Sequence, residues 1–352
     1  MRRLPIFLLV DVSESMVGEP LYQLEEGIAR IAAALRKDPH ALETAHLSVI
    51  AFAGKPRTLT RLTEMFAFQP PELPVGGGTA LGAALEHLMA EIDKEVRLGT
   101  AERKGDWKPL VFLMTDGHPT DDAAPAIARW RRDYARRANL VAVSIGPGAD
   151  LDLLRRLTDE VLVLNDAAPG AFARFIQWIS SSVAAQSRSV ATVGDGGGVT
   201  LAKADADLLA PAAAAGGSVD DRFAVFVGRC AQSSLPYLAK YERHLGKIET
   251  DDPVLAQLFR TRRYALKSVT PVKNSYFELS EASASGQSVA SGDLIGQPPC
   301  PHCSAPFGMA VCSCGNVHCL GEEAQQRCPW CGNLGTYGMV EGEGLSVGRA
   351  RG

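Results

Sequence analysis

Ile6-Phe-Leu-Leu-Val-Asp11-Val-Ser13-Glu-Ser15 is the stretch of sequence that decides the fold of the N-terminal part of this chain. Its five consecutive apolar residues predict a strand buried on both faces, which is typical of a parallel sheet. The run ends at Asp11, and Ser13 and Ser15 follow at alternate positions. Because these side chains offer only oxygen ligands, the loop suits Mg²⁺, Mn²⁺ or Ca²⁺ rather than zinc or copper.

Strand-like and helix-like segments then alternate to about Val183. The predicted strands are Leu4–Val10, Leu47–Phe52, Thr58–Leu62, Leu110–Met114, Leu140–Ile145 and Val161–Leu164, and the last predicted helix is Ala171–Val183. Such alternation favours an α/β fold in which helices cover both faces of a mostly parallel sheet. We therefore expect residues 3–183 to form a Rossmann-like, doubly wound domain.

Two further loops carry oxygen ligands where strands end. Thr79 follows three glycines and opens a predicted helix, and Asp116 leaves the strand Leu110–Met114. In open α/β sheets ligands bind beyond the carboxyl ends of the strands, so these loops are expected to converge on the first one. Taken singly, each loop also fits a helix cap or a tight turn. The predicted site for a hard cation comprises Asp11, Ser13, Ser15, Thr79 and Asp116.

The composition changes after residue 183. Residues 184–218 are small, polar and rich in Gly and Pro, which is typical of a linker. Residues 219–340 are expected to form a small β-rich, zinc-ribbon-like domain, and residues 341–352 a frayed tail. The predicted β-type runs are Phe223–Gly228, Tyr237–Tyr241, Tyr264–Val269 and Tyr276–Leu279. So small a core predicts a domain that needs metal to fold.

Seven of the eight cysteines lie within a cluster at about 298–335, which in a reducing compartment indicates metal binding rather than disulfides. Two Cys-x-x-Cys motifs predict one tetrahedral zinc site, formed by Cys300, Cys303, Cys328 and Cys331. A second metal site is an open alternative, with the ligands Cys312, Cys314, His318 and Cys319. Cys230 stands apart and is interpreted as a small core residue.

The bulk composition excludes several classes of function. A formal net charge of −4 provides no general field that would attract nucleic acid or an acidic membrane. No apolar run approaches the roughly 18–20 residues that span a bilayer. The apolar run near the N-terminus is short and ends in Asp11 without a cleavage site. We therefore expect a cytoplasmic protein with no membrane partner.

The five oxygen-bearing residues and their order resemble the complete metal-ion-dependent adhesion site of von Willebrand factor type A domains. The resemblance covers residues 4–183 and implies direct ligation by Ser13, Ser15 and Thr79, with Asp11 and Asp116 acting mainly through water. A metal held largely by neutral hydroxyls stays electrophilic, so an Asp or Glu of a partner protein would complete its coordination. The implied ion is Mg²⁺, with Mn²⁺ or Ca²⁺ as alternatives.

The second half carries a further resemblance. The run Phe226-Val-Gly-Arg-Cys-Ala-Gln-Ser-Ser-Leu-Pro-Tyr237-Leu-Ala-Lys-Tyr241 precedes Cys-Pro-x-Cys, Cys-x-Cys-Gly and Cys-Pro-Trp-Cys. Together with the N-terminal domain, this layout resembles TerY-type proteins of bacterial tellurium-resistance and chemical-stress systems over nearly the whole chain. It implies a C-terminal metal-binding domain. It also implies a phosphosignalling scaffold whose partners are a PP2C-type phosphatase and a Ser/Thr kinase.

These observations predict a non-catalytic, divalent-metal-dependent protein-binding scaffold. The sequence lacks a Gly-x-Ser-x-Gly elbow and a Gly-Lys-Ser/Thr phosphate loop. One alternative is a metal-dependent hydrolase or phosphatase that uses Asp11, Ser13 and His118, although a loop position favours a solvated His118.

The other alternative is nucleic-acid binding by a basic patch of the second domain. This patch comprises Lys240, Arg243, His244, Lys247, Arg260, Arg262 and Arg263, with the aromatic residues Tyr241 and Tyr264. Because Glu242, Glu249, Asp251 and Asp252 interrupt it, a solvated face of mixed charge is the favoured interpretation. Nucleic acid is therefore not an expected partner.

Overall fold

The computed structural model describes residues 2–100, 104–145, 149–164, 175–184, 209–211, 222–244, 263–281, 288–338 and 345–350. By its internal contacts the chain divides into two compact units, Met1–Ser218 and Val219–Gly352. Within the described residues, no helix combines the length and the apolarity that crossing a membrane requires.

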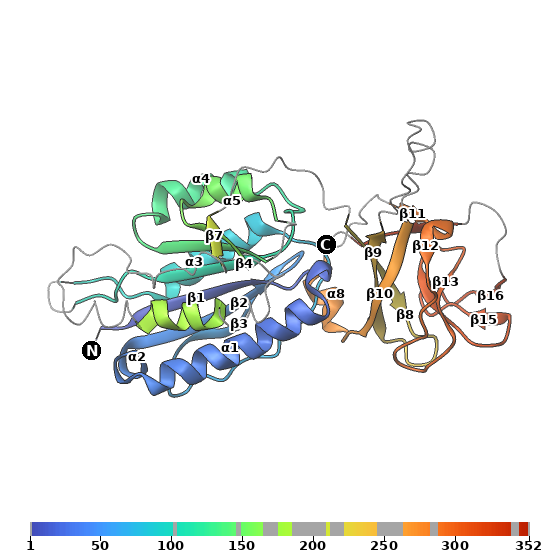
Figure 1. Cartoon of the computed structure of the whole chain (residues 1–352), viewed down its shortest axis with the longest axis horizontal. Coiled ribbons are helices and arrows are strands. Elements are labelled where there is room, and N and C mark those ends of the chain that lie inside the picture. The colour runs from blue at the N-terminus through green and yellow to red at the C-terminus, as the bar shows by residue number, and fades with distance from the viewer. Residues whose placement is uncertain are drawn as a thin grey trace, which may run out of the picture. The chain divides into compact units, whose positions relative to one another are not determined.

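The first unit is built on a seven-stranded sheet with the strand order β3-β2-β1-β4-β5-β6-β7 (Figure 1). Its strands are β1 (Leu4–Asp11), β2 (Ala45–Phe52), β3 (Pro56–Glu64), β4 (Leu110–Thr115), β5 (Asn139–Ile145), β6 (Val161–Leu164) and β7 (Leu209–Pro211). The β2–β3 and β6–β7 pairs are antiparallel, and the other pairs are parallel. The prediction of a mostly parallel α/β sheet is confirmed. The apolar run that opens the chain forms β1, which is buried along its whole length between β2 and β4.

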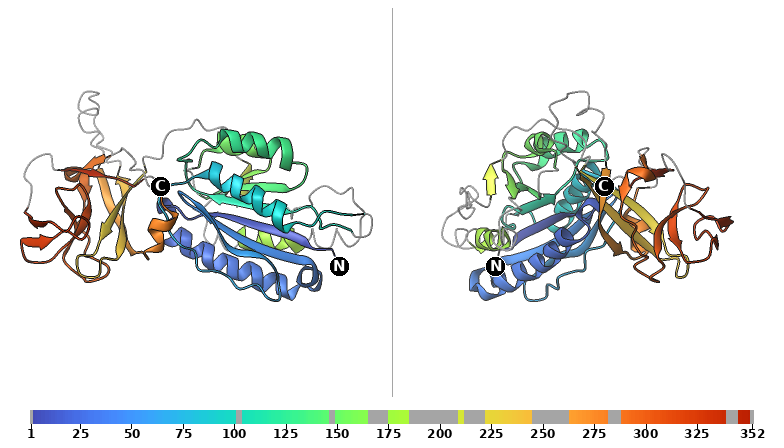
Figure 2. Two further views of the ribbon diagram at one scale, coloured as in Figure 1. Left: turned by 180° about the vertical axis from the view of Figure 1, so that it is seen from behind. Right: turned by 45° about the vertical axis from the view of Figure 1, so that its right-hand side comes forward.

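Helices cover both faces of this sheet, as a doubly wound fold requires (Figures 1 and 2). They are α1 (Glu19–Lys37), α2 (Pro39–Thr44), α3 (Leu81–Glu95), α4 (Ala124–Arg129), α5 (Leu151–Leu157) and a helical segment over residues 175–184. One face packs α3, α4 and α5 against side chains such as Phe7 and Leu113. On the other face, the ring of Phe112 meets Trp178 of the helical segment edge-on, with ring centroids 6.2 Å apart.

Strand β7 lies inside the segment predicted as a linker, residues 184–218, and pairs with β6. The linker prediction is wrong for these three residues, because the open edge of β6 offers backbone groups with which an extended segment can pair. Apart from Ala184, which is the last described residue of the helical segment, the rest of the predicted linker lies outside the described residues.

The second unit contains a six-stranded sheet with the strand order β12-β10-β9-β8-β14-β13. Its strands are β8 (Phe223–Arg229), β9 (Pro236–His244), β10 (Arg263–Pro271), β12 (Leu294–Ile295), β13 (Phe307–Val311) and β14 (Val317–Leu320). Two small ladders pair β11 (Ser288–Ala290) with β17 (Ser346–Gly348) and β15 (Gln325–Arg327) with β16 (Leu334–Thr336). Its small core includes Phe226 and Tyr241, whose ring centroids are 5.7 Å apart. The expectation of a β-rich second domain is confirmed.

Two details of the prediction for this unit are wrong. The run Tyr276–Leu279 belongs to a short helix, α8 (Ser275–Leu279), because its buried side chains are three positions apart, which is helical spacing. The predicted tail, residues 341–352, contributes strand β17, in which Val347 pairs with Val289 and is buried with it in the core.

Candidate metal sites

The register of the parallel β1–β4 ladder brings Asp11 and Asp116 to the same edge of the first sheet. Asp11 is completely buried. Its Oδ1 accepts a hydrogen bond from the Ser13 backbone N–H at 2.9 Å, and its Oδ2 accepts one from Thr115 Oγ1 at 2.6 Å. Both carboxylate oxygens are therefore fixed in place by the strand ends themselves.

Ser13, Ser15 and Asp116 form a continuous hydrogen-bonded group. The two serine Oγ atoms are 3.0 Å apart, and Ser15 Oγ donates to Asp116 Oδ1 over 2.7 Å. Both serines are buried, whereas Asp116 is half-buried. Hydroxyl and carboxylate oxygens from β1 and β4 thus meet at one point, which opens toward solvent on the Asp116 side.

Thr79 borders the same space. A Cβ atom placed on Gly117 would lie 3.6 Å from Thr79 Oγ1 and 3.8 Å from Ser15 Oγ. The two hydroxyls therefore lie on the same side of this glycine and close to each other. Thr120 holds the Thr79 loop in position. Its Oγ1 accepts from the Thr79 N–H at 3.0 Å, and its own N–H donates to the Thr79 carbonyl at 2.9 Å. The structure therefore brings the five sequence-predicted residues to one edge of the sheet.

The electrostatics of Asp11 favour a cation. Burial raises the pKa of Asp11 to about 6, and hydrogen bonds from Thr115 and Ser13 offset this effect only in part. A divalent ion nearby would stabilise the charged carboxylate and offset the cost of burying it. Because the donor set consists of hydroxyl and carboxylate oxygens, these residues fit Mg²⁺, Mn²⁺ or Ca²⁺.

Three supporting residues were not assigned from the sequence. Thr115 orients Asp11, and its position directly before Asp116 at a strand end is a signal that could have identified it. Glu14 is buried and accepts a hydrogen bond from the Gly78 N–H at 3.4 Å. Asp121 accepts from two backbone N–H groups in the first turn of α3, at 3.1 and 2.9 Å, and so caps the helix that follows Thr79.

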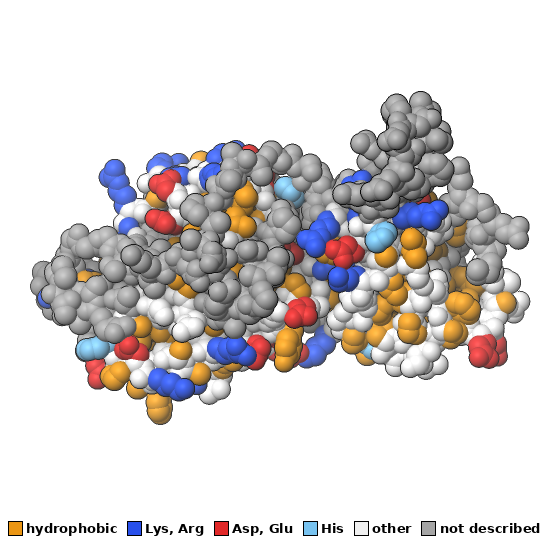
Figure 3. All heavy atoms as spheres, viewed as in Figure 1, with side chains coloured by type: hydrophobic (Ala, Val, Ile, Leu, Met, Phe, Trp, Pro, Cys, Tyr) orange, Lys and Arg blue, Asp and Glu red, His pale blue; other side chains and the backbone are white. Residues whose placement is uncertain are grey.

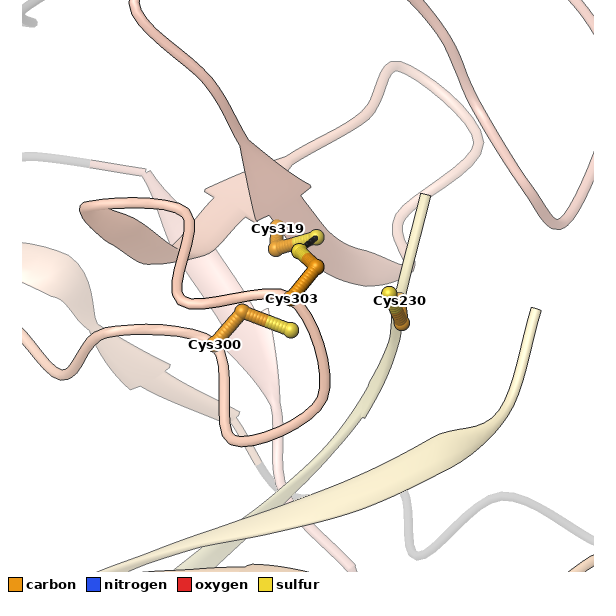
Figure 4. A group of neighbouring side chains, drawn as sticks. All are labelled: Cys230, Cys300, Cys303 and Cys319. Atoms are coloured by element: carbon orange, nitrogen blue, oxygen red, sulfur yellow. Dashed lines mark hydrogen bonds between the residues drawn. The ribbon is translucent and has the colours of Figure 1, made fainter. Parts of the chain in front are cut away.

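The cysteines of the second unit form two groups of four. The first group, Cys230, Cys300, Cys303 and Cys319, has all its sulfur atoms within 4.8 Å of one another. In Figure 4 these side chains face a shared space from the loop after β8, the turn before β13, and strand β14. Cys303 Sγ and Cys319 Sγ are 3.7 Å apart, well beyond the length of a disulfide bond.

The second group consists of Cys312, Cys314, Cys328 and Cys331, also with sulfur atoms within 4.8 Å of one another. Its ligands come from the β13–β14 turn and from the turn between β15 and β16. Sulfur atoms from the two turns lie 3.8 Å apart in both the Cys312–Cys331 and Cys314–Cys328 pairs.

This grouping corrects the predicted zinc ligands. The predicted set of Cys300, Cys303, Cys328 and Cys331 does not form, because the two Cys-x-x-Cys turns belong to different groups. The β13–β14 hairpin lies between them and provides each with separate partners. Cys230, interpreted from the sequence as a core residue, completes the first group.

His318 does not join either group, contrary to the alternative of a Cys₃His site. Successive side chains of a strand point to opposite faces, so His318 faces away from the group that holds Cys319. Its Nδ1 is 2.9 Å from the backbone oxygen of Cys319, and its Nε2 is 2.8 Å from the Tyr337 hydroxyl. The fully buried histidine is therefore satisfied by hydrogen bonds.

Three of the cysteines begin the same local turn. In each case the N–H donates to the carbonyl five residues on, and the carbonyl accepts from the N–H four residues on, at 2.8–2.9 Å. These cysteines are Cys230, Cys300 and Cys328. The fourth residue after each has a positive φ: 58° at Ser234, 60° at Ser304 and 76° at Gly332. Because non-glycine residues seldom adopt this conformation, the recurrence indicates that Cys230 opens a metal-binding turn like the other two.

The four thiols of a group cannot all ionise by themselves, because each thiolate disfavours the next. Burial raises the pKa of Cys319, whereas at Cys230 hydrogen bonds with Ser233 and neighbouring groups outweigh burial and lower the pKa to about 6. In the second group a backbone hydrogen bond lowers the pKa of Cys312 to about 6, and burial raises that of Cys328 to about 12. A cation that stabilises every thiolate removes this conflict, so both groups fit tetrahedral zinc.

Comparison with known families places both sites in recognised domains. Residues 6–166 match the family model of the von Willebrand factor type A domain, and residues 220–352 match that of the TerY-C metal binding domain. The first match contains the five oxygen-bearing residues predicted from the sequence, and the second contains both cysteine groups. No curated protein matches the chain.

Solved structures resemble the chain at low identity. Proximal thread matrix protein 1 from the mussel byssus is 17% identical, with 52% of this chain and 48% of that chain covered and a TM-score of 0.38. The pilus adhesin SpaC from Lactobacillus rhamnosus GG is 13% identical, with 52% and 30% covered and a TM-score of 0.41. A von Willebrand factor type A protein from Catenulispora acidiphila is 14% identical, with 79% and 68% covered and a TM-score of 0.42. The chain spans about half the length of the first of these.

Proposed function

Because this chain joins a von Willebrand factor type A domain to a TerY-C metal binding domain, we propose that it is a non-catalytic scaffold that captures a partner protein through a divalent metal. The metal is Mg²⁺, or Mn²⁺ or Ca²⁺, at the oxygen site of the first unit. The ligand from the partner is an Asp or Glu side chain.

The observation that carries this proposal is the meeting of three hydroxyls and two carboxylates where β1 and β4 end and α3 begins. Ser13, Ser15 and Thr79 would hold the ion directly, and Asp11 and Asp116 would balance its charge. When bound, the ion supplies a Lewis-acidic position for an outside carboxylate. Asp11 and the serines are buried while Asp116 is half-exposed, so the open side of the site faces solvent, where a partner can reach it.

The second unit is stabilised by two zinc ions in this proposal, one in each cysteine group. The small core around Phe226 supports this role, since a domain of this kind gains much of its folding free energy from metal ligation. The two groups lie on different turns and strands, so two ions would restrain both ends of the β13–β14 hairpin.

The partners that we propose are a PP2C-type phosphatase and a Ser/Thr kinase of a bacterial tellurium-resistance or chemical-stress system, in the cytoplasm. Support for this assignment comes from the match to the TerY-C family alone. The assignment is tested by capturing partners from a cell lysate on the immobilised chain, because the proteins retained in the presence of Mg²⁺ can be identified by mass spectrometry.

The positions of the relevant side chains support a binding role over hydrolysis. Ser13 Oγ pairs with Ser15 Oγ, whereas His118 Nδ1 lies 3.9 Å from Asp150 Oδ2. A serine activated by a histidine would need these two groups within hydrogen-bond reach.

The basic patch of the second unit is interrupted by Glu242, and one of its cations, Lys240, is buried. Glu242 accepts from Arg222 at 3.1 Å and from Lys267 at 3.0 Å, and Lys240 is buried with its Nζ over the ring of Phe223. Acidic and basic side chains are interspersed on the face shown in Figure 3. Lys247, Arg260 and Arg262 lie outside the described residues. This arrangement favours a protein partner over nucleic acid.

The test is capture of partners from a cell lysate by the immobilised, zinc-loaded chain, with and without Mg²⁺. We expect retention that needs Mg²⁺ and is lost in the variant Asp11→Ala. The matched control is Asp122→Ala, which removes an exposed carboxylate of the loop after β4 and should retain the same proteins. Equal capture by Asp11→Ala, or capture unaffected by removing Mg²⁺, would contradict the proposal.

A further inference from the structure

A cavity of about 440 Å³ lies at the end of the first unit opposite to the oxygen site. Its walls come from the residues before β1, the end of α3, the segment leading into β4, and the residues before β5. In Figure 1 this is the end that carries the N mark. Since β1 has eight residues and a strand rises ~3.3 Å per residue, roughly 25 Å separate the cavity from the oxygen site.

Cationic side chains dominate the lining of this cavity. They are Arg2, Arg97, Lys104, Lys108, Arg136 and Arg137. Asp106 is the one acidic residue among the described residues that line it. Arg3, which is not a lining residue, donates to Asp106 Oδ1 at 3.0 Å and Oδ2 at 2.5 Å, and the Arg97 backbone N–H donates to Oδ2 at 2.8 Å. The single carboxylate is therefore already occupied, and the cavity keeps an excess of positive charge.

Not every one of these cations is available to a ligand. Arg137 pairs with Asp93 at 2.7 Å, and Arg2 donates to the Gly105 carbonyl while its guanidinium lies 3.6 Å from the ring centre of Trp107. Lys104 and Arg136, in contrast, are exposed and form no ion pair with a described carboxylate. These two side chains can turn toward an anion in the cavity without giving up an ion pair among the described residues.

The rest of the lining is apolar. Ile92, Val96, Leu98, Trp107 and Pro109 form it. Leu98 is 71% exposed, which is costly in water for so large a side chain and would be relieved by an apolar ligand group. A cationic rim beside an apolar wall matches a ligand that carries both a phosphate and a flat apolar group.

We propose that this cavity binds a nucleoside phosphate. Lys104 and Arg136 engage the phosphates, and the base lies against the wall formed by Leu98 and Trp107. The volume falls within the ~300–1,000 Å³ of small-molecule sites. Inorganic phosphate would make no contact with the apolar wall, and an acidic peptide segment has no flat apolar group to cover it.

The test uses the full, zinc-loaded chain in Mg²⁺-free buffer at low ionic strength, titrated with ADP in a calorimeter. We expect one ADP per chain, with binding that weakens as salt is added. The double variant Lys104→Gln/Arg136→Gln should weaken binding by about tenfold or more, because it removes two charge-assisted contacts. Arg132→Gln removes a cation that is 70% exposed and does not line the cavity, so it should bind ADP normally. Asp11→Ala should also bind ADP normally, which separates this site from the oxygen site.

Several results would overturn the proposal. The proposal fails if ADP at millimolar concentration gives no heat of binding. It also fails if the double variant binds ADP as tightly as the parent chain. Inorganic phosphate that binds as tightly as ADP would show that the apolar wall plays no part. An oligoglutamate peptide that binds while ADP does not would assign the cavity to acidic protein segments instead. Unchanged near-ultraviolet circular dichroism of each variant establishes that its fold is intact.

Discussion

The oxygen site of the first unit and the cysteine groups of the second differ in how their ligands are brought together. The five oxygen-bearing residues end or follow β1, follow β4 or precede α3, and they lie at the one edge of the sheet where its parallel strands end. Each cysteine group combines residues from separate turns. The first group also needs β14, which carries Cys319, to lie beside β8, which leads to Cys230. In a parallel sheet, the common direction of the strands is enough to bring the residues of a site to one edge. In a small β domain, the residues that meet depend on which strands are neighbours.

The largest expected difference between the two units is their dependence on metal. Removing zinc with a chelator should unfold the second unit, because ligation of each structural zinc contributes on the order of 10 kcal/mol in small domains. The first unit should stay folded, since its core is built from buried apolar side chains of the sheet and helices. Hydrogen exchange, resolved peptide by peptide, measures the protection of backbone amides in both units of one sample. Protection that persists in β8 and β9 after complete zinc removal would contradict this expectation.

The grouping of the cysteines predicts zinc stoichiometry. Cys230→Ser and Cys314→Ser should each lower the zinc content from two ions per chain to one, because each removes a ligand from a different group. Native mass spectrometry counts the ions directly. If Cys230→Ser keeps both ions, Cys230 is a core residue and the earlier interpretation from the sequence is right.

The oxygen site should reveal itself by the pH dependence of stability without Mg²⁺. The pKa of Asp11 is about 6 in the folded chain and 3.8 when unperturbed, so the folded state binds more protons between these values. Stability of the first unit should therefore fall as pH rises from about 4 to 6, by about 3 kcal/mol at most. Urea unfolding at several pH values measures this loss. Asp11→Asn should flatten the profile over that range, and an unchanged profile would remove Asp11 as its cause.

The smallest expected effect concerns the residue that orients Asp11. Thr115→Val removes the 2.6 Å hydrogen bond to Asp11 Oδ2 while keeping the shape of the side chain. We expect Mg²⁺ affinity to drop by about tenfold, which is the lower end of the loss when one hydrogen bond to a charged group is removed. Calorimetric titration with Mg²⁺ measures it. The control is Thr63→Val on the edge strand β3, where the Thr63 hydroxyl makes an exposed hydrogen bond to the Arg61 carbonyl. A loss as large as that of Asp11→Ala would mean that Thr115 is itself a ligand.

The two sites also differ in how much of them could be predicted. Asp11, Ser13 and Ser15 follow a wholly apolar strand, and Asp116 follows another, so their meeting could be inferred from chain direction. Thr115 was not assigned, although its hydroxyl stands at the same strand end. Cys230 was missed because it lacks a Cys-x-x-Cys partner. The sequence signal that could have identified Cys230 is Ser234, four residues after it, which repeats the spacing between Cys300 and Ser304.

From the sequence alone follow the five residues of the oxygen site, the mostly parallel sheet of the first unit, and the expectation that the second unit binds metal through its cysteines. These properties depend on local features such as apolar runs, strand ends and the chemistry of oxygen and sulfur. The tertiary structure decided which cysteines share a group, that His318 lies outside both, and that a cationic cavity forms at the far end of β1. These depend on strand neighbours and on segments distant along the chain, which no local pattern specifies.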